Sequence, residues 1–136
     1  MLIRILTPDP ILLDDPVRPS ITPRERIHGM NRAVFAWVED KEICAIACVS
    51  YQQNIPKQVE DLLDFRQWPT KAILYSVWSY KKGSASKLIR AFVKRMRSEK
   101  LRIITMSPKT NMARNFHLKN GAKVLKRNSR TINYEY

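Results

Sequence analysis

One short segment combines residue types that suit the binding of an anion. It joins an apolar run to an amphipathic one and reads Ser79-Tyr80-Lys81-Lys82-Gly83-Ser84-Ala85-Ser86-Lys87. If a helix begins after Gly83, its first backbone N–H groups have no internal partners and lie at the positive end of the helix dipole, so they form an anion site. The small residues would let a phosphate approach the backbone. No Walker-type loop or dinucleotide fingerprint is present, so a plain strand-to-helix connection is the alternative interpretation.

The distribution of charge along the chain favours an anionic partner for the same region. Residues 1–70 carry 8 basic and 10 acidic side chains, a formal charge of −2, whereas residues 71–136 carry 17 basic and 2 acidic side chains, a formal charge of +15. A ligand with several phosphates, or a nucleic acid, is the natural partner class for such a half-chain. A basic, solvated face without a specific ligand is the simpler alternative.

Length and composition predict one domain over residues 1–136. The chain has 44% hydrophobic residues and two cysteines, Cys44 and Cys48, in one apolar run. We expect these cysteines to be buried small hydrophobes, since two thiols cannot form a disulfide framework or a four-ligand zinc site. Charged residues and prolines interrupt the short apolar stretches at the N-terminus, so we expect no signal peptide, no membrane span and a cytoplasmic location.

The hydrophobic pattern predicts an α/β (α+β) domain with a mixed central sheet of about six to seven strands and helices on both faces. Residues 1–30 are proline-rich, with an edge strand and a short helix from Pro23 to Met30, and residues 31–136 form the core. The expected strands are residues 32–38, 43–51, 71–79, 101–106, 122–127 and 131–136, and the expected helices are residues 56–65, a four-turn helix after Gly83, and 111–120. The strand–helix–strand order of residues 71–106 predicts a right-handed crossover between parallel strands.

The boundaries of the predicted helix 111–120 are clear. Gly121 is a suitable left-handed residue after its end. We expect Met112, Phe116 and Ala113 to point inward.

Residues 72–122 resemble the core of the GNAT N-acetyltransferase superfamily, which transfers an acetyl group from acetyl-CoA to an amine. The pyrophosphate loop of that family reads Gln or Arg, two residues, Gly, one residue, then Gly or Ala. Gly83 and Ala85 match this pattern, and Tyr80 departs from it. The family often also has Asn, Ala and Tyr shortly before a Gly-Phe pair. In the stretch from Thr110 to Ala122, His117 stands at the tyrosine position. The resemblance covers roughly residues 30–136.

The resemblance implies where acetyl-CoA would bind. Its phosphates would lie on the loop made of Tyr80, Lys81, Lys82, Gly83, Ser84, Ala85 and Ser86. Its pantetheine arm would run between two parallel strands that splay apart, bonded to the backbone of Tyr75 and Val77, with Asn111 or Ser107 contributing from the other side.

The resemblance also makes His117 the candidate catalytic residue. The matching tyrosine of the family can protonate the departing thiolate, and an imidazole held protonated near neutral pH could do the same. A surface or capping histidine is the alternative interpretation. The usual general base, often a glutamate on the central strand, has no counterpart in residues 71–79, and Asp40 and Glu42 could reach the site only in some geometries. The base is therefore unassigned, with deprotonation through water as the fallback.

The function expected from these observations is acetyl transfer from acetyl-CoA to a primary amine by direct attack on the thioester, in a monomer or homodimer. The amine would belong to a small molecule or a protein. Residues 8–30 and 52–70 would shape its pocket, and their acidic side chains suggest a cationic acceptor. Two alternatives stay open: a basic nucleic-acid-binding module, for which no recognised signature is present, and a non-catalytic acyl-CoA-binding member of the same fold.

Overall fold

A single mixed sheet organises the fold in the computed structural model, which describes residues 1–29, 31–63 and 67–136. Within these residues the sheet has eight strands in the order β1-β2-β3-β4-β5-β8-β6, with β7 paired to β8. The strands are β1 (Leu2–Ile5), β2 (Arg32–Glu39), β3 (Glu42–Gln52), β4 (Lys71–Ser79), β5 (Arg102–Thr105), β6 (Ser107–Pro108), β7 (Lys123–Arg127) and β8 (Thr131–Glu135). The sequence predicts about six to seven strands. The additional strand is β6, which has two residues and follows β5 closely in the chain. The predicted parallel pair is confirmed as β4 and β5.

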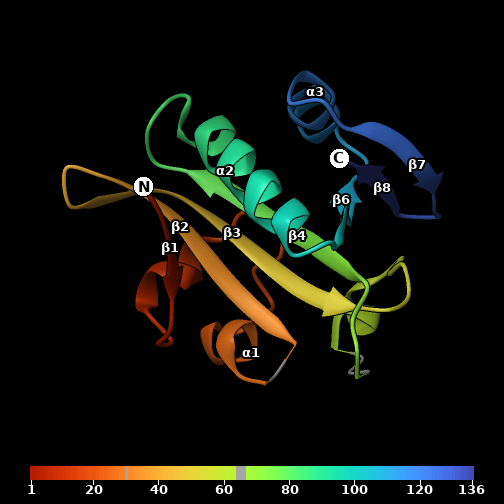
Figure 1. Ribbon diagram of the computed structural model, residues 1–136, viewed down its shortest axis with the longest axis horizontal. Coiled ribbons are helices and arrows are strands. Elements are labelled where there is room, and N and C mark those ends of the chain that lie inside the picture. The colour runs from red at the N-terminus through yellow and green to blue at the C-terminus, as the bar shows by residue number, and fades with distance from the viewer. Residues whose placement is uncertain (30, 64–66) are drawn as a thin grey trace.

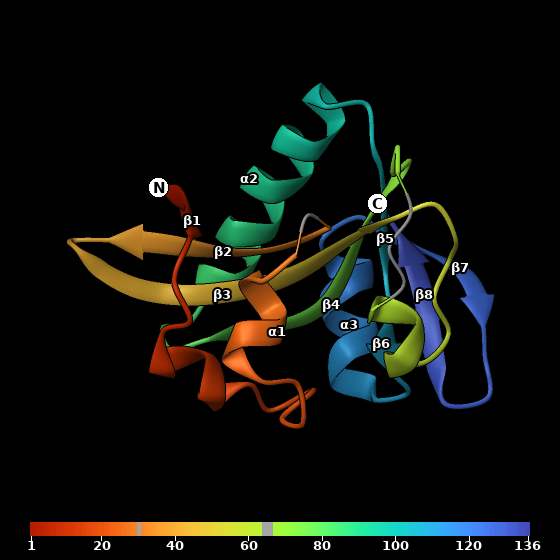
Figure 2. The same cartoon turned by 90° about the horizontal axis from the view of Figure 1, so that it is seen from below.

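The helices cover both faces of the sheet, as predicted (Figures 1 and 2). They are α1 (Pro23–Ile27), α2 (Ser84–Ser98), α3 (Asn111–Lys119) and two 3-10 helices, η1 (Pro10–Asp14) and η2 (Val59–Leu63). The helix expected over residues 56–65 is η2 alone, and residues 64–65 lie outside the described part of the chain. Helix α1 ends before the predicted Met30, which is also outside it. No helix among the described residues is long and apolar enough to cross a membrane.

Successive side chains of the central strands point to opposite faces of the sheet, so they form two apolar clusters, one on each face. Leu88, Phe92 and Met96 of α2 are fully buried against one face of the sheet. Ile73 and Tyr75 of β4 point to the other face, under η1 and α1. Because both faces of β4 are covered, its sequence is an almost continuous apolar run. The strand that carries the site is therefore held rigidly in the middle of the molecule.

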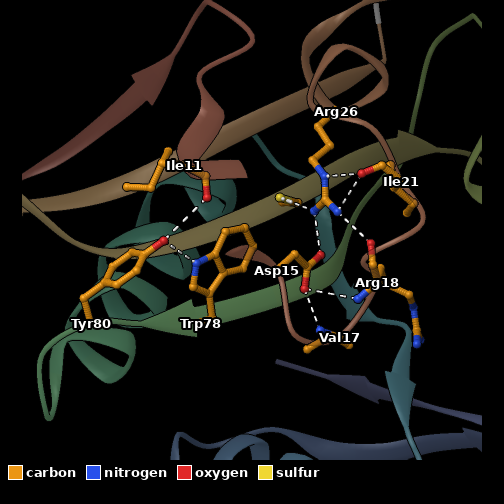
Figure 3. Close-up of polar contacts among 9 residues, drawn as sticks. Ile11, Asp15, Val17, Arg18, Ile21, Arg26, Trp78 and Tyr80 are labelled. Atoms are coloured by element: carbon orange, nitrogen blue, oxygen red, sulfur yellow. Dashed lines mark hydrogen bonds and ion pairs between the residues drawn. The ribbon is translucent and has the colours of Figure 1, made fainter. Parts of the chain in front are cut away.

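A buried ion pair fixes the segment that covers the second face, residues 10–27, which we call the N-terminal cover (Figure 3). Arg26 and Asp15 are fully buried at the side chain, with Nη1 2.6 Å from Oδ2. The same guanidinium donates to the carbonyls of Ile21 and Arg18 and contacts Cys48 Sγ at 3.3 Å. Burial raises the pKa of the Cys48 thiol to about 11, so this cysteine is neutral as well as buried. Removing one partner of such a pair leaves an uncompensated buried charge.

The inward face of α3 differs from the sequence prediction. Met112, expected inward, is 83% exposed, and His117 is the buried residue of the helix. These two positions are five residues apart and so lie about 140° apart around a helix. His117 stacks on Tyr134 with ring centroids 5.2 Å apart and meets Tyr136 edge-on. Tyr134 of β8 and Tyr136 just after it thus set the rotation of α3, which its own periodicity does not reveal.

Candidate functional site

The parallel strands β4 and β5 separate halfway along β4. Their pairing runs from Lys71–Arg102 to Leu74–Thr105 and ends with the bond from Met106 N–H to the Leu74 carbonyl, at 2.9 Å. The chain after β5 then pairs with β8 through β6. The second half of β4, from Tyr75 onward, therefore has β3 on one side and an opening on the other.

An irregularity in the β3–β4 ladder lies at the start of this opening. Cys48 faces Ser76 and Val49 faces Leu74, so Tyr75 is an extra residue, a β-bulge. Further along, Tyr80 N–H bonds to the Cys44 carbonyl at 2.8 Å. Because backbone groups alternate in direction along an antiparallel ladder, those of Val77 point away from β3 and into the opening. A strand with free backbone groups beside a gap is suited to bind an extended amide chain.

A cavity of about 380 Å³ fills the opening, and we call it the strand cavity. Its walls are residues 74–79 of β4, Ala85 of α2, residues 106–108, Thr110 with four side chains of α3, and Pro16 with Val17 from the N-terminal cover. The lining is mostly apolar, but Ser76 Oγ is buried and has no hydrogen-bond partner among the described residues. An unsatisfied buried hydroxyl is costly, so Ser76 fits a ligand with hydrogen-bonding groups.

The loop of residues 80–83 leads from β4 to the start of α2 beside this cavity. Gly83 has φ 83° and stands at the N-cap of α2 without any side-chain cap. Ser84 N–H bonds to the Lys81 carbonyl at 3.1 Å, which leaves the N–H groups of Ala85 and Ser86 without intrahelical acceptors. A Cβ atom built on Gly83 would meet nothing within 4 Å, so the backbone there is open. This geometry fits the predicted anion site.

A carboxylate that sequence reasoning missed accompanies the lysines of this loop. Glu39, at the end of β2, pairs with Lys81 Nζ at 3.2 Å and with Lys87 Nζ at 2.8 Å. The hydrogen bond from Lys87, together with those from Trp37 and Lys81, lowers the pKa of Glu39 to about 2. Lys82 is exposed and forms no ion pair with any described residue. A phosphate arriving at the loop would therefore meet one free lysine and compete with Glu39 for two others.

Tyr80 does not turn its hydroxyl toward the start of α2. Its Oη donates to Asp14 Oδ2 at 2.6 Å. The same oxygen accepts from Trp78 Nε1 at 2.9 Å (Figure 3). Burial and the carboxylate of Asp14 raise the pKa of Tyr80 to about 12. The side chain thus ties the loop to the N-terminal cover, and the loop offers backbone groups rather than this hydroxyl.

His117 lines the strand cavity and is neutral there. Its Nδ1 lies 2.6 Å from Tyr136 Oη, and burial lowers the pKa of the imidazole to about 4. The ring is therefore neutral near pH 7, so it does not meet the condition under which an imidazole would act as the proton donor. When Tyr136 donates to Nδ1, the proton of the neutral ring is on Nε2, so the ring still carries one N–H donor.

The structure brings several of the sequence-predicted residues into one site. Tyr75, Val77, Ala85, His117 and Ser107 line the strand cavity. The remaining predicted residues flank it: Lys81, Lys82, Gly83, Ser84 and Ser86 lie in or beside the loop, and Asn111 begins α3 between the lining residues Thr110 and Met112. No aspartate or glutamate lines the cavity among the described residues, so a general base stays unassigned.

Sequence reasoning missed Ser76 and the partner of His117. The run from Ala72 to Trp78 is apolar or aromatic except for Ser76. This single small polar residue could have been identified from the sequence as a candidate for ligand binding. The contact between His117 and Tyr136 joins residues of two elements and has no local signature.

Comparison with known proteins identifies the fold. No family model matches the sequence, and no curated protein matches it. Among solved structures, the chain is similar to a malonyl-CoA decarboxylase from Rhodopseudomonas palustris, with a TM-score of 0.75, 17% identity, and coverage of 100% of this chain and 59% of that one. It is also similar to a protein assigned to the GNAT acetyltransferase family from Desulfovibrio desulfuricans, with a TM-score of 0.68, 16% identity, and coverage of 100% and 97%.

A third similar structure holds a ligand. It is the PaiA N-acetyltransferase of Thermoplasma acidophilum in complex with coenzyme A, with a TM-score of 0.57, 14% identity, and coverage of 78% of this chain and 60% of that one. The chain spans 34% to 60% of the three malonyl-CoA decarboxylase chains that it matches. The resemblance found in the sequence is confirmed at the level of structure, because this chain has the GNAT fold.

Proposed function

We propose that the chain is an acetyl-CoA-dependent N-acetyltransferase that uses the strand cavity for its acyl donor. One observation carries the proposal: the opening between β4 and β5 holds an apolar cavity of about 380 Å³ that adjoins the uncapped start of α2. A long thioester with an amide-containing arm at one end and phosphates at the other needs this combination of an open strand edge and a helix N-terminus.

Each part of the donor then has a partner in this chain. The backbone of Val77 and the hydroxyl of Ser76 bind the amide-containing arm, with the bulged Tyr75 beside them and Asn111 or Ser107 contributing from the facing side. The free N–H groups of Ala85 and Ser86 bind the pyrophosphate, and the open backbone at Gly83 allows its close approach. Lys82 binds a phosphate directly, while Lys81 and Lys87 exchange Glu39 for it.

The chemistry follows from positioning rather than from a charged catalyst. The amine of a small-molecule or protein acceptor attacks the thioester carbonyl, the C–N bond forms, and the C–S bond breaks. The proton of the amine leaves through water, because no carboxylate lines the strand cavity among the described residues. Backbone N–H groups of β4 stabilise the developing oxyanion, and the N–H of neutral His117 bonds to the departing sulfur.

Two observations favour a second candidate, the binding of a CoA thioester without transfer to an amine. His117 is neutral, with a pKa lowered to about 4, and the described lining offers no general base. Three of the similar structures are malonyl-CoA decarboxylases, which act on a CoA thioester by name. Both candidates require the same donor site, and they differ in whether an amine is acetylated.

The test is calorimetric titration of the nucleic-acid-free protein with acetyl-CoA, comparing Gly83→Asp with Gly121→Asp. Both glycines have positive φ, 83° and 100°, and open space for a Cβ, so the backbone strain is matched. We expect Gly83→Asp to lower the affinity about a hundredfold, because a carboxylate takes the place of the phosphate, and Gly121→Asp to leave it near the wild-type value.

The outcomes separate the candidates. Unchanged affinity in a folded Gly83→Asp protein overturns the donor site. Binding that is followed by CoA release only when an amine is added supports transfer, and binding without any such release supports the second candidate. No binding of acetyl-CoA, together with RNA binding that weakens steeply with salt, would favour the basic nucleic-acid-binding module.

A further inference from the structure

A second cavity, of about 680 Å³, lies between the N-terminal cover, η2 and the β7–β8 hairpin, and we call it the basic cavity. Its lining includes four cationic side chains and one acidic one: Arg18, Lys57, Lys126, Arg130 and Glu60. None of the four cations forms an ion pair with a carboxylate in the part of the chain that the structure describes. The cavity therefore presents an uncompensated positive charge, and this charge suits an anion.

Arg18, one of the lining residues, has an unsatisfied donor. Its Nε atom is buried and has no hydrogen-bond partner among the described residues, although Nη2 donates to the Met106 carbonyl at 3.3 Å. Burial lowers the pKa of Arg18 below its ordinary value. A buried guanidinium N–H without an acceptor is costly, so Arg18 keeps hydrogen-bonding capacity that the described residues do not use.

The walls of the basic cavity are fixed before any ligand binds. Asp15 Oδ1 accepts from Arg18 N–H at 3.1 Å, and Arg26 donates to the Arg18 carbonyl at 2.7 Å, so the buried ion pair positions Arg18 (Figure 3). On the facing side, Thr131 Oγ1 donates to the Lys57 carbonyl at 2.7 Å. The cations are thus carried by backbone that is already hydrogen-bonded in place.

The basic cavity shares a wall with the strand cavity. Pro16 and Val17 line the strand cavity, and the next residue, Arg18, lines the basic one. Pro108 of the strand cavity pairs with Thr131 of the basic cavity in the β6–β8 ladder. The two cavities therefore lie on adjacent sides of the same backbone segments.

We propose that the basic cavity binds the phosphate of a phosphorylated primary-amine acceptor, whose amine points toward the strand cavity. This inference rests on the proposed acetyltransferase function and names its substrate class. Four cations against one carboxylate match a dianionic phosphate better than a singly charged carboxylate. Residues 8–30 and 52–70, whose acidic side chains suggested a cationic acceptor, contribute one carboxylate to the described lining of this cavity, that of Glu60. Asp15 is neutralised by Arg26, and Asp61 Oδ2 accepts from Lys57 N–H.

The first arm of the test measures phosphate binding alone. Phosphoethanolamine is titrated into the protein with and without saturating CoA, and ethanolamine serves as the unphosphorylated control. The Lys126→Gln/Arg130→Gln double variant removes two cations at exposed positions, and Lys94→Gln/Arg97→Gln on α2 removes two cations outside the basic cavity. We expect saturable binding of phosphoethanolamine that weakens at least tenfold in the first double variant and is unchanged in the second.

The second arm measures transfer with matched amines. With acetyl-CoA as donor, we expect kcat/KM for glucosamine 6-phosphate to exceed that for glucosamine by about a hundredfold, and this preference to shrink about tenfold in Lys126→Gln/Arg130→Gln. Absence of phosphoethanolamine binding, or equal loss in both double variants, overturns the inference. Equal or preferred use of the unphosphorylated amine overturns it as well. A protein that binds phosphoethanolamine but not CoA would instead overturn the proposed function.

Discussion

The two helices that border the strand cavity begin and pack in opposite ways. Helix α2 starts at Gly83 without a side-chain cap, whereas α3 starts at Thr110, whose Oγ1 accepts from Ala113 N–H at 3.2 Å. Helix α2 is anchored by apolar side chains, and α3 is anchored by one buried histidine on two tyrosines. The difference shows which helix offers free N–H groups to a ligand: α2 has fully buried apolar residues and an open start, whereas α3 has a capped start and only partly buried apolar residues, Phe116 and Leu118.

The largest expected effect concerns the apolar anchor of α2. Phe92 is fully buried and meets Phe35 edge-on, with ring centroids 5.6 Å apart. We expect Phe92→Ala to lower the free energy of unfolding by about 3–5 kcal/mol, measured by urea denaturation. On α3 the matched variant is Phe116→Ala, which removes a half-buried ring and should cost less than half as much. Equal losses would mean that the two helices are anchored alike.

The second prediction concerns the histidine anchor of α3. The pKa of His117 is about 4 in the folded chain, against about 6.5 in the unfolded one, so the unfolded state binds the additional proton. Stability should therefore fall as the pH drops from about 6.5 toward 4, by up to about 3 kcal/mol, and the lost stability returns above that window. Denaturation at a series of pH values measures the slope, and His117→Gln should remove it.

This slope can be separated from other titrations. The pKa of Glu39 is lowered from 4.5 to about 2 and that of Glu135 is also lowered, so both carboxylates begin to lose their contribution at about pH 4.5, and the slope above about pH 5 belongs to His117. An NMR titration of the imidazole C–H signals gives the pKa directly. A value between 6 and 7 would contradict the neutral ring and restore the protonated imidazole as a candidate acid.

The third prediction removes the cap that distinguishes α3 from α2. Thr110→Ala deletes the acceptor for Ala113 N–H, and we expect it to cost about 1 kcal/mol in unfolding free energy, with recovery in Thr110→Ser. Urea denaturation of the three proteins measures both changes. No loss in Thr110→Ala would mean that the start of α3 does not depend on its cap, and the contrast between the two helix starts would then lose its meaning.

Local signals were sufficient to predict the elements that form the strand cavity. Strand 71–79 and the start of α2 after Gly83 were predicted at the observed positions. Both signals, the hydrophobic pattern and a glycine that accepts a left-handed conformation, depend only on residues close together in the sequence. Helix α3 was predicted to within one residue for the same reason, ending before Gly121 at φ 100°. The opening between β4 and β5 came from the family resemblance, since no local pattern specifies where two strands separate.

The parts that sequence reasoning missed depend on contacts between distant residues. Glu39 reaches Lys81 and Lys87 across 42 and 48 positions of the chain. Arg26 is fully buried because Asp15 and three acceptors surround it, whereas an arginine in a short helix is ordinarily solvated. These pairings arise only when the sheet has assembled, so the charge state of the site could not be deduced from the sequence.

The smallest expected effect tests whether Glu39 weakens the binding of a phosphate at the open start of α2. Glu39→Gln removes the charge that pairs with Lys81 and Lys87, so both lysines become free for a phosphate. We expect acetyl-CoA to bind about twofold to fivefold more tightly at low salt, by calorimetry, with the gain shrinking as salt rises.

The matched control for this variant is Glu99→Gln at the other end of α2. Glu99 contacts Arg95 at 3.9 Å and lies far along the helix from the loop, so its loss changes the net charge equally without freeing a loop lysine. A gain in both variants would assign the effect to net charge alone. A loss of affinity in Glu39→Gln would mean that the carboxylate orders the lysines for the ligand instead of competing with it, and the start of α2 would then be a preorganised site whose lysines are held in place by Glu39.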